Sequence, residues 1–153
     1  ERRLVHQLHR RMFMKSSLPA ALVALVFVLG AAGSSLASEA KPYSVAFTSK
    51  DAVKVGATGQ CDLTITPAEG HVLKTVTPFK GKLSASETVA LTQNTYAAKD
   101  FVDAKAFAKT IAAKFTGKTA GEANIKADLT FFICNEELCK RYQDATSCSA
   151  KVE

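Results

Sequence analysis

Alternation of apolar and polar side chains is the main pattern along residues 43–152. Three segments, 43–47, 60–66 and 147–152, place apolar side chains at every second position. Period two is typical of strands with one buried face, so each segment is expected to be a strand. Residues 123–134, ANIKADLTFFIC, show it most clearly, with one face made of Ala123, Ile125, Ala127, Leu129, Phe131 and Ile133.

Other segments complete the fold prediction. Residues 71–79 read as extended chain in which Pro78 limits pairing, and 88–92 as a further strand. Residues 99–116 fit two patterns: Phe101, Ala104, Ala108, Ile111 and Phe115 at helical spacing, or Phe107, Ile111, Ala113 and Phe115 on a strand face. Short strands at eight-to-twelve-residue spacing predict an all-β, immunoglobulin-like β-sandwich, which a strand at about 106–116 would complete.

The N-terminal 37 residues have the layout of a leader. Lys15 precedes an apolar run, and Ser35 and Ala37 stand at the −3 and −1 positions of a signal-peptide cleavage site. We expect cleavage after Ala37, with Ala40 as the second choice, and translation starting at Met12 or Met14. The alternative is a membrane anchor, because the uncharged run 16–38 is just long enough to cross a bilayer. The sequence thus predicts a leader and signal peptide at 1–37 and one domain at 38–153, periplasmic or secreted.

Charge changes the picture once the leader is set aside. The whole chain has a formal net charge of +6, but residues 38–153 hold 15 Lys and Arg against 13 Asp and Glu, a net charge of +2. No lysine cluster with interleaved aromatic residues remains in this part. Nucleic-acid binding therefore has little support.

Four cysteines lie in the expected domain, and an even number in a small exported domain indicates disulfides. Cys61 and Cys148 share their strand faces with apolar residues, so both are expected to point inward and to pair. Cys134 falls on the face opposite Ile133, and Cys139 follows across NEEL, which predicts an exposed Cys134–Cys139 pair. The first pair closes a long loop and stabilises the fold, whereas the second closes a very short one.

Other chemistry has weaker signals. Zinc sites usually combine four Cys or His ligands in paired spacing. Residues 38–153 contain a single histidine, His71, and no second close pair of cysteines, so no metal is expected. His71 is expected to be a surface or packing residue at a strand start. Glu136 and Glu137 are expected to be solvated and to disfavour a nearby thiolate. No nucleophile elbow, phosphate-binding loop or HExxH motif occurs, and no cofactor is expected.

The segment GEANIKADLTFFICNEELC, residues 121–139, resembles the N-terminal periplasmic domain of the thiol:disulfide interchange protein DsbD, the disulfide bond corrector family. Residues 53–74 and 98–121 are similar to upstream parts of that domain, which favours a strand at 106–116. The resemblance implies an immunoglobulin-like sandwich whose Cys139 reacts in mixed disulfides and whose Cys134 resolves them. The family's aromatic-proline run after the second cysteine is replaced here by KRYQD.

Two functional hypotheses follow. In the first, Cys134 and Cys139 exchange disulfides with another protein, a thioredoxin-like oxidoreductase or a membrane electron donor. In the second, the chain is a non-catalytic periplasmic or secreted β-sandwich that binds a partner and is held by two structural disulfides. Contact with a membrane is expected only if the signal is not cleaved.

Overall fold

Two antiparallel sheets make up most of the described chain in the computed structural model, which describes residues 40–153. The predicted leader, 1–37, lies outside these residues. Between 40 and 153, no helix is long and apolar enough to cross a membrane. The elements in chain order are β1 (Tyr43–Ser49), β2 (Thr58–Pro67), β3 (Val72–Leu73), β4 (Lys80–Ala85), β5 (Val89–Leu91), β6 (Thr95–Tyr96), the 3₁₀ turn η1 (Ala98–Asp100), β7 (Lys109–Gly117), β8 (Gly121–Cys134) and β9 (Cys139–Val152).

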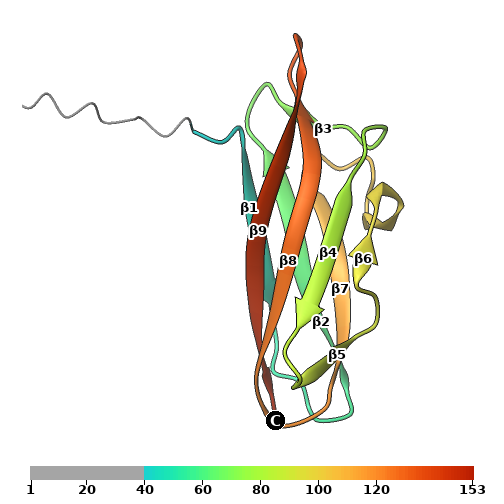
Figure 1. The fold of residues 1–153 in the computed structure, drawn as a ribbon, viewed down its shortest axis with the longest axis vertical. Helices are drawn as coiled ribbons and strands as arrows, with labels where there is room; N and C mark the ends of the chain where they lie inside the picture. Colours follow the sequence, from blue (N-terminus) through green and yellow to red (C-terminus); the bar gives the residue numbers. More distant parts are fainter. Residues whose placement is uncertain (1–39) are drawn as a thin grey trace, which may run out of the picture. The chain divides into compact units, whose positions relative to one another are not determined.

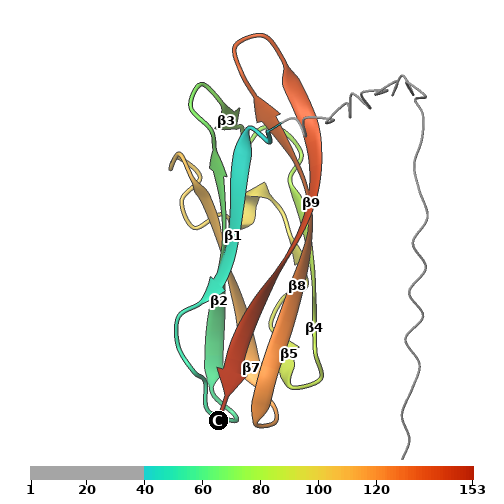
Figure 2. The same ribbon diagram turned by 90° about the vertical axis from the view of Figure 1, so that its left-hand side faces the viewer.

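The strands form two layers, as Figures 1 and 2 show from two directions. The first sheet has the order β1-β2-β7-β5. In the second sheet, β8 pairs with β9 on one side and with β3 and β4 on the other, and β6 lies beyond β4. Two antiparallel sheets packed face to face are the architecture of an immunoglobulin-like β-sandwich, which confirms the predicted fold class.

The core lies between the two sheets and follows the predicted alternation. Each odd-numbered side chain of β8 from Ala123 to Ile133 is buried, and each points away from solvent because successive strand residues face opposite sides. The first sheet presents a matching set from its two central strands. Those buried side chains are Cys61, Leu63 and Ile65 of β2 and Ile111, Ala113 and Phe115 of β7.

The ambiguous segment 99–116 is a strand in its second part, from Lys109 onward. β7 pairs along its length with β2, from Thr58↔Thr116 to Ile65↔Lys109, and its other edge pairs with β5. The helical spacing of Phe101 and Ala104 therefore does not correspond to a helix. The short turn η1 ends at Asp100, before both residues. The predicted strand face extended too far back, because Phe107 is 56% exposed in the loop that precedes β7.

Two predicted segments had the wrong bounds, and one strand was not predicted. The predicted strand at 147–152 is the second half of β9, which pairs continuously with β8 from Cys134↔Cys139 to Gly121↔Val152. Of the extended segment 71–79, only Val72 and Leu73 pair, and they do so with the end of β8. The strand β4 was not expected at all, although it pairs with β8 over six residues from Lys80 to Ala85.

Candidate functional site at the cysteine hairpin

β8 and β9 form a long hairpin whose tip carries the second cysteine pair. Cys134 and Cys139 are the last directly opposed residues, and a disulfide joins them with a Cα–Cα distance of 3.9 Å. Residues 135–138 make the turn. The Asn135 side-chain oxygen accepts hydrogen bonds from the backbone N–H groups of Glu137 and Leu138, at 3.0 and 2.8 Å. The turn is therefore held by the disulfide at its base and by the Asn135 side chain inside it.

The other disulfide lies in the core. Cys61 of β2 and Cys148 of β9 are joined at a Cα–Cα distance of 6.5 Å, and both are at most 1% exposed. Because β2 belongs to the first sheet and β9 to the second, this bond links the two layers of the sandwich. Both pairs are those predicted from the alternation phases.

The two cysteines of the hairpin pair differ in exposure. Cys139 is exposed, whereas Cys134 is 0% exposed. The prediction that this disulfide is exposed was therefore wrong for Cys134. The cause is β3: Val72 pairs with Cys134, so Cys134 lies in a row between Val72 on one side and Cys139 on the other. A reagent in solution can reach this disulfide only from the Cys139 side.

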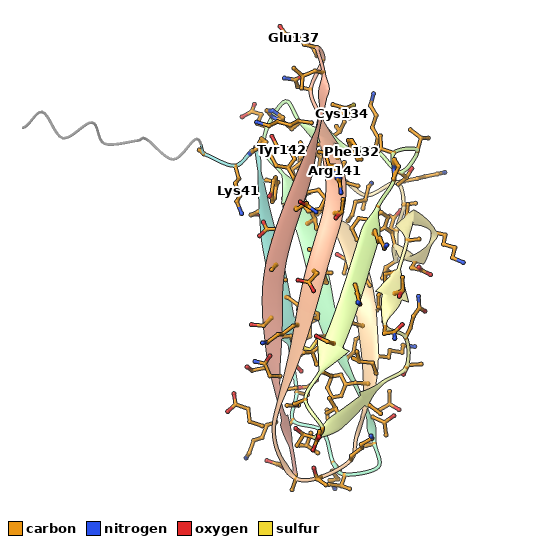
Figure 3. The ribbon with its side chains drawn as sticks, in the orientation of Figure 1. Lys41, Phe132, Cys134, Glu137, Arg141 and Tyr142 are labelled. Atoms are coloured by element: carbon orange, nitrogen blue, oxygen red, sulfur yellow. A yellow bond between two sulfur atoms is a disulfide. The ribbon has the colours of Figure 1, made fainter. Side chains whose placement is uncertain are left out.

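Charged side chains lie on both sides of this disulfide. Glu136 and Glu137 in the turn are exposed, as predicted. Arg141 lies two residues after Cys139 and therefore on the same face of β9, where it pairs directly with Phe132 (Figure 3). The exposed sulfur thus has two carboxylates towards the tip and one guanidinium towards the body of the sheet.

An aromatic cluster supports the inner side of the hairpin. The Tyr43 ring of β1 contacts the rings of Phe131 and Tyr142 edge-on, with centroid distances of 4.9 and 5.0 Å. Beside it, the Lys41 ammonium donates a 2.9 Å hydrogen bond to the Asp144 carboxylate. Aromatic contacts of this geometry each add about 0.5–1.5 kcal/mol beyond area burial, so they anchor β1 against β9.

This cluster shifts two pKa values. Burial and the neighbouring Asp144 carboxylate raise the pKa of Tyr43 well above its usual value. Burial also acts to raise the pKa of Asp144, but the hydrogen bond from Lys41, the nearby Tyr43 hydroxyl and the Ala145 backbone N–H outweigh it, and the pKa is lowered. Both groups therefore keep their ordinary charge at neutral pH, and neither is prepared for proton transfer.

His71 lies where it was predicted, directly before β3 and half-buried. Its Nδ1 atom is 3.0 Å from the backbone oxygen of Glu69. It lines a groove of about 410 Å³ beside the hairpin, and the groove offers it no serine, cysteine or carboxylate partner. The other lining residues are Ala40, Lys41, Pro42, Ile133, Asn135, Leu138, Lys140 and Tyr142. In the described part of the chain, no three His, Cys, Asp or Glu side chains are grouped to hold a metal ion.

Sequence reasoning missed one group of polar residues. Five exposed cations lie on the outer face of the second sheet. Lys151 is paired with Glu153, and we call the other four the cationic face. Each of them occupies an outward position of its strand. Two of them belong to β4, which was not recognised as a strand. The cationic face consists of Lys80 and Lys82 of β4, Lys126 of β8 and Arg141 of β9.

Comparisons with known proteins give no family. No family model matches the chain, and no curated protein matches it. Among solved structures, a fragment of native alpha-2-macroglobulin from Escherichia coli, from domain MG7 to the C-terminus, has a TM-score of 0.47 and 14% identity. The match covers 73% of this chain but only 16% of that one. AggA, the major subunit of aggregative adherence fimbriae type I from Escherichia coli, has a TM-score of 0.36 and 12% identity over 72% of this chain and 95% of its own.

Proposed function

We propose that this chain is an exported β-sandwich that binds a partner molecule and performs no chemistry of its own. The observation that carries the proposal is the complete burial of Cys134 beside the exposed Cys139. Together with the buried Cys61–Cys148 bond, it describes two disulfides that hold the fold together. Disulfides of this kind belong to oxidising compartments, which supports a periplasmic or secreted location.

The burial of Cys134 argues against easy reduction of the hairpin disulfide. A thiolate from solution would attack the Cys139 sulfur, because that is the accessible one. The bond to Cys134 would then break, and the departing negative charge would fall on a buried sulfur. Burying an uncompensated charge is unfavourable, and exchange slows when the leaving thiolate is poorly stabilised. This arrangement favours a structural disulfide.

Export and disulfide formation can be tested together. The chain would be produced with its own leader in a Gram-negative bacterium, the periplasmic fraction collected, and the intact mass measured after alkylation of free thiols. The proposal expects a product that begins at Ser38 and takes up no alkylating reagent. A cytoplasmic product with alkylated cysteines, or a membrane-bound one that keeps residues 1–37, would overturn it.

Thiol–disulfide exchange is the second candidate, and one observation favours it. Cys139 is exposed and has Arg141 on the same strand face, where a cation stabilises a thiolate. In this candidate, which follows from the resemblance to the N-terminal domain of DsbD, the reduced Cys139 attacks a partner disulfide and forms a mixed disulfide. Cys134 then attacks the Cys139 sulfur, closes the pair again and releases the partner's thiol.

A variant that keeps only the exposed thiol of the pair tests this candidate. In Cys134→Ser, the alkylation rate of Cys139 is measured against pH, with and without Arg141→Gln. Exchange activity requires substantial thiolate at neutral pH and a clear loss of rate when Arg141 is removed. If the pH dependence of the alkylation rate is that of an ordinary thiol and does not change in Arg141→Gln, the binding module remains the proposed function.

A further inference from the structure

The cationic face lies on the outer side of the second sheet, where it fits a polymer of acidic sugars. We propose that this face binds an acidic polysaccharide. The proposal rests on the binding module proposed above, for which it names the surface and the class of partner. Figure 3 looks onto this side of the sandwich, with Phe132 and Arg141 near the upper end of the sheet.

Strand register places these side chains in rows across the sheet. Arg141 stands opposite Phe132, Lys80 opposite Thr130, and Lys82 opposite Asp128. Neighbouring strands are about 4.8 Å apart, so Arg141 on β9 and the two lysines on β4 flank β8 at a separation of roughly 10 Å. Lys126 closes the lower end of the same area, two residues beyond Asp128.

The four cations are free to bind a ligand. The ion pairs Lys41–Asp144, Lys50–Asp62 and Lys151–Glu153 include no residue of the cationic face. Between Phe132 and Lys126, the only outward acidic side chain of β8 is Asp128. Asp128 offsets one of the four charges, and the remaining like charges repel one another, so an anionic ligand relieves a cost that the free protein bears.

A hollow lies among these residues, with a volume of about 650 Å³. Seven of its nine lining residues are polar or charged, and Asp144 among them is already bonded to Lys41. The hollow supplies cations for carboxylates and neutral groups that both donate and accept hydrogen bonds, as sugar hydroxyls require. The lining residues are Lys80, Lys82, Asp128, Leu129, Thr130, Arg141, Gln143, Asp144 and Ala145.

The neutral residues favour a saccharide over an acidic protein. Protein interfaces have an apolar centre with charges at the rim, whereas here Phe132 is the single large apolar side chain that β4, β8 and β9 present outward. The other apolar residue of the outer face, Val72, lies on β3 beside Cys134. The most exposed large apolar residues, Val76 and Val102, lie in loops and not on the strands of this face. A half-buried ring beside Arg141 instead suits the C–H face of a sugar whose carboxylate meets the guanidinium.

Affinity electrophoresis with polygalacturonate tests the proposal on the oxidised domain. The wild type should be retarded, and Lys80→Ser/Lys82→Ser should bind about tenfold or more weakly, a loss of about 1.4 kcal/mol or more, because it removes two of the four cations that would meet the polymer's carboxylates. The matched control is Lys99→Ser/Lys118→Ser, which removes the same charge from two exposed lysines elsewhere. It should bind within about twofold of the wild type.

Three further polymers decide between kinds of partner. Dextran tests sugar without charge, polyglutamate tests an acidic peptide, and duplex DNA tests phosphate. The proposal expects polygalacturonate to bind most tightly of the four polymers. The Phe132→Ala substitution should abolish polygalacturonate binding and leave the weaker polyglutamate binding unchanged.

Several results would overturn the proposal. Equal binding of polyglutamate or DNA, equal losses in the control variant, or no binding of polygalacturonate would each do so. None of these results changes the thiol count or the location of the chain, so the proposed exported module would still stand. A circular dichroism spectrum of each variant confirms that it folds.

Discussion

Loss of the Cys61–Cys148 bond should destabilise the domain far more than loss of Cys134–Cys139. The first bond closes a loop with a sequence separation of 87, which corresponds to about 4.6 kcal/mol of lost unfolded-chain entropy. The second closes a separation of 5, which corresponds to about 2 kcal/mol. Domains of this size are stable by about 5–15 kcal/mol, so the core bond supplies a large share.

The assay is urea unfolding followed by circular dichroism. With a slope of about 1–3 kcal/mol per molar urea, Cys61→Ala/Cys148→Ala should unfold at a midpoint about 1–2 M below that of Cys134→Ala/Cys139→Ala. Burial of both core sulfurs adds a cavity cost in the same direction. The two contributions must therefore be separated.

Single substitutions separate them. If the cross-link dominates, Cys61→Ala alone and Cys148→Ala alone each cost nearly as much as the double substitution, because either one breaks the bond. If cavities dominate, the two single costs add up to the double. The reasoning is refuted if the costs are additive, or if loss of the hairpin bond lowers the midpoint as much as loss of the core bond.

Two further predictions concern packing and pH. Gly59→Ala should cost about 1–3 kcal/mol in urea unfolding because its new methyl group would meet the Phe115 ring at 2.5 Å, whereas Gly81→Ala, whose nearest neighbour is 3.5 Å away, should cost less; equal costs would contradict this. Asp144→Asn should cost up to about 1 kcal/mol at pH 7, since Lys41 is largely exposed. Because the folded pKa of Asp144 is lowered, this difference should disappear as the pH falls below 3.8, and a difference that persists in acid would refute the assignment.

The sequence predicts those parts of the fold where a strand buries one complete apolar face. β8 is the clearest case, since its odd-numbered residues from Ala123 to Ile133 are apolar and all are buried. The same phase argument identified both disulfides. Cys148 shares a face with Ala150 and Val152, and this was enough to place it inward.

Other parts depend on contacts that no local pattern contains. In the first half of β9 the inward positions include Asp144 and Thr146, which are only half-buried, so no apolar alternation marks it as a strand. In β4 the inward pair is Gly81 and Leu83, too weak a signal for a strand.

The burial of Cys134 could not be predicted for the same reason. It depends on Val72, which is more than sixty positions away in sequence and pairs with Cys134 only in the folded sheet. The cationic face was missed for the related reason that its lysines become neighbours only when β4 lies beside β8.

Redox equilibration read out cysteine by cysteine tests the central claim most directly. The oxidised domain is brought to equilibrium over a graded series of thiol buffers, free thiols are alkylated, and each cysteine is quantified by peptide mass. If both disulfides are structural, Cys134–Cys139 and Cys61–Cys148 should both stay closed until potentials below about −300 mV. Opening of Cys134–Cys139 well above that potential, with Cys61–Cys148 still closed, would contradict the account and make thiol–disulfide exchange the function of the hairpin.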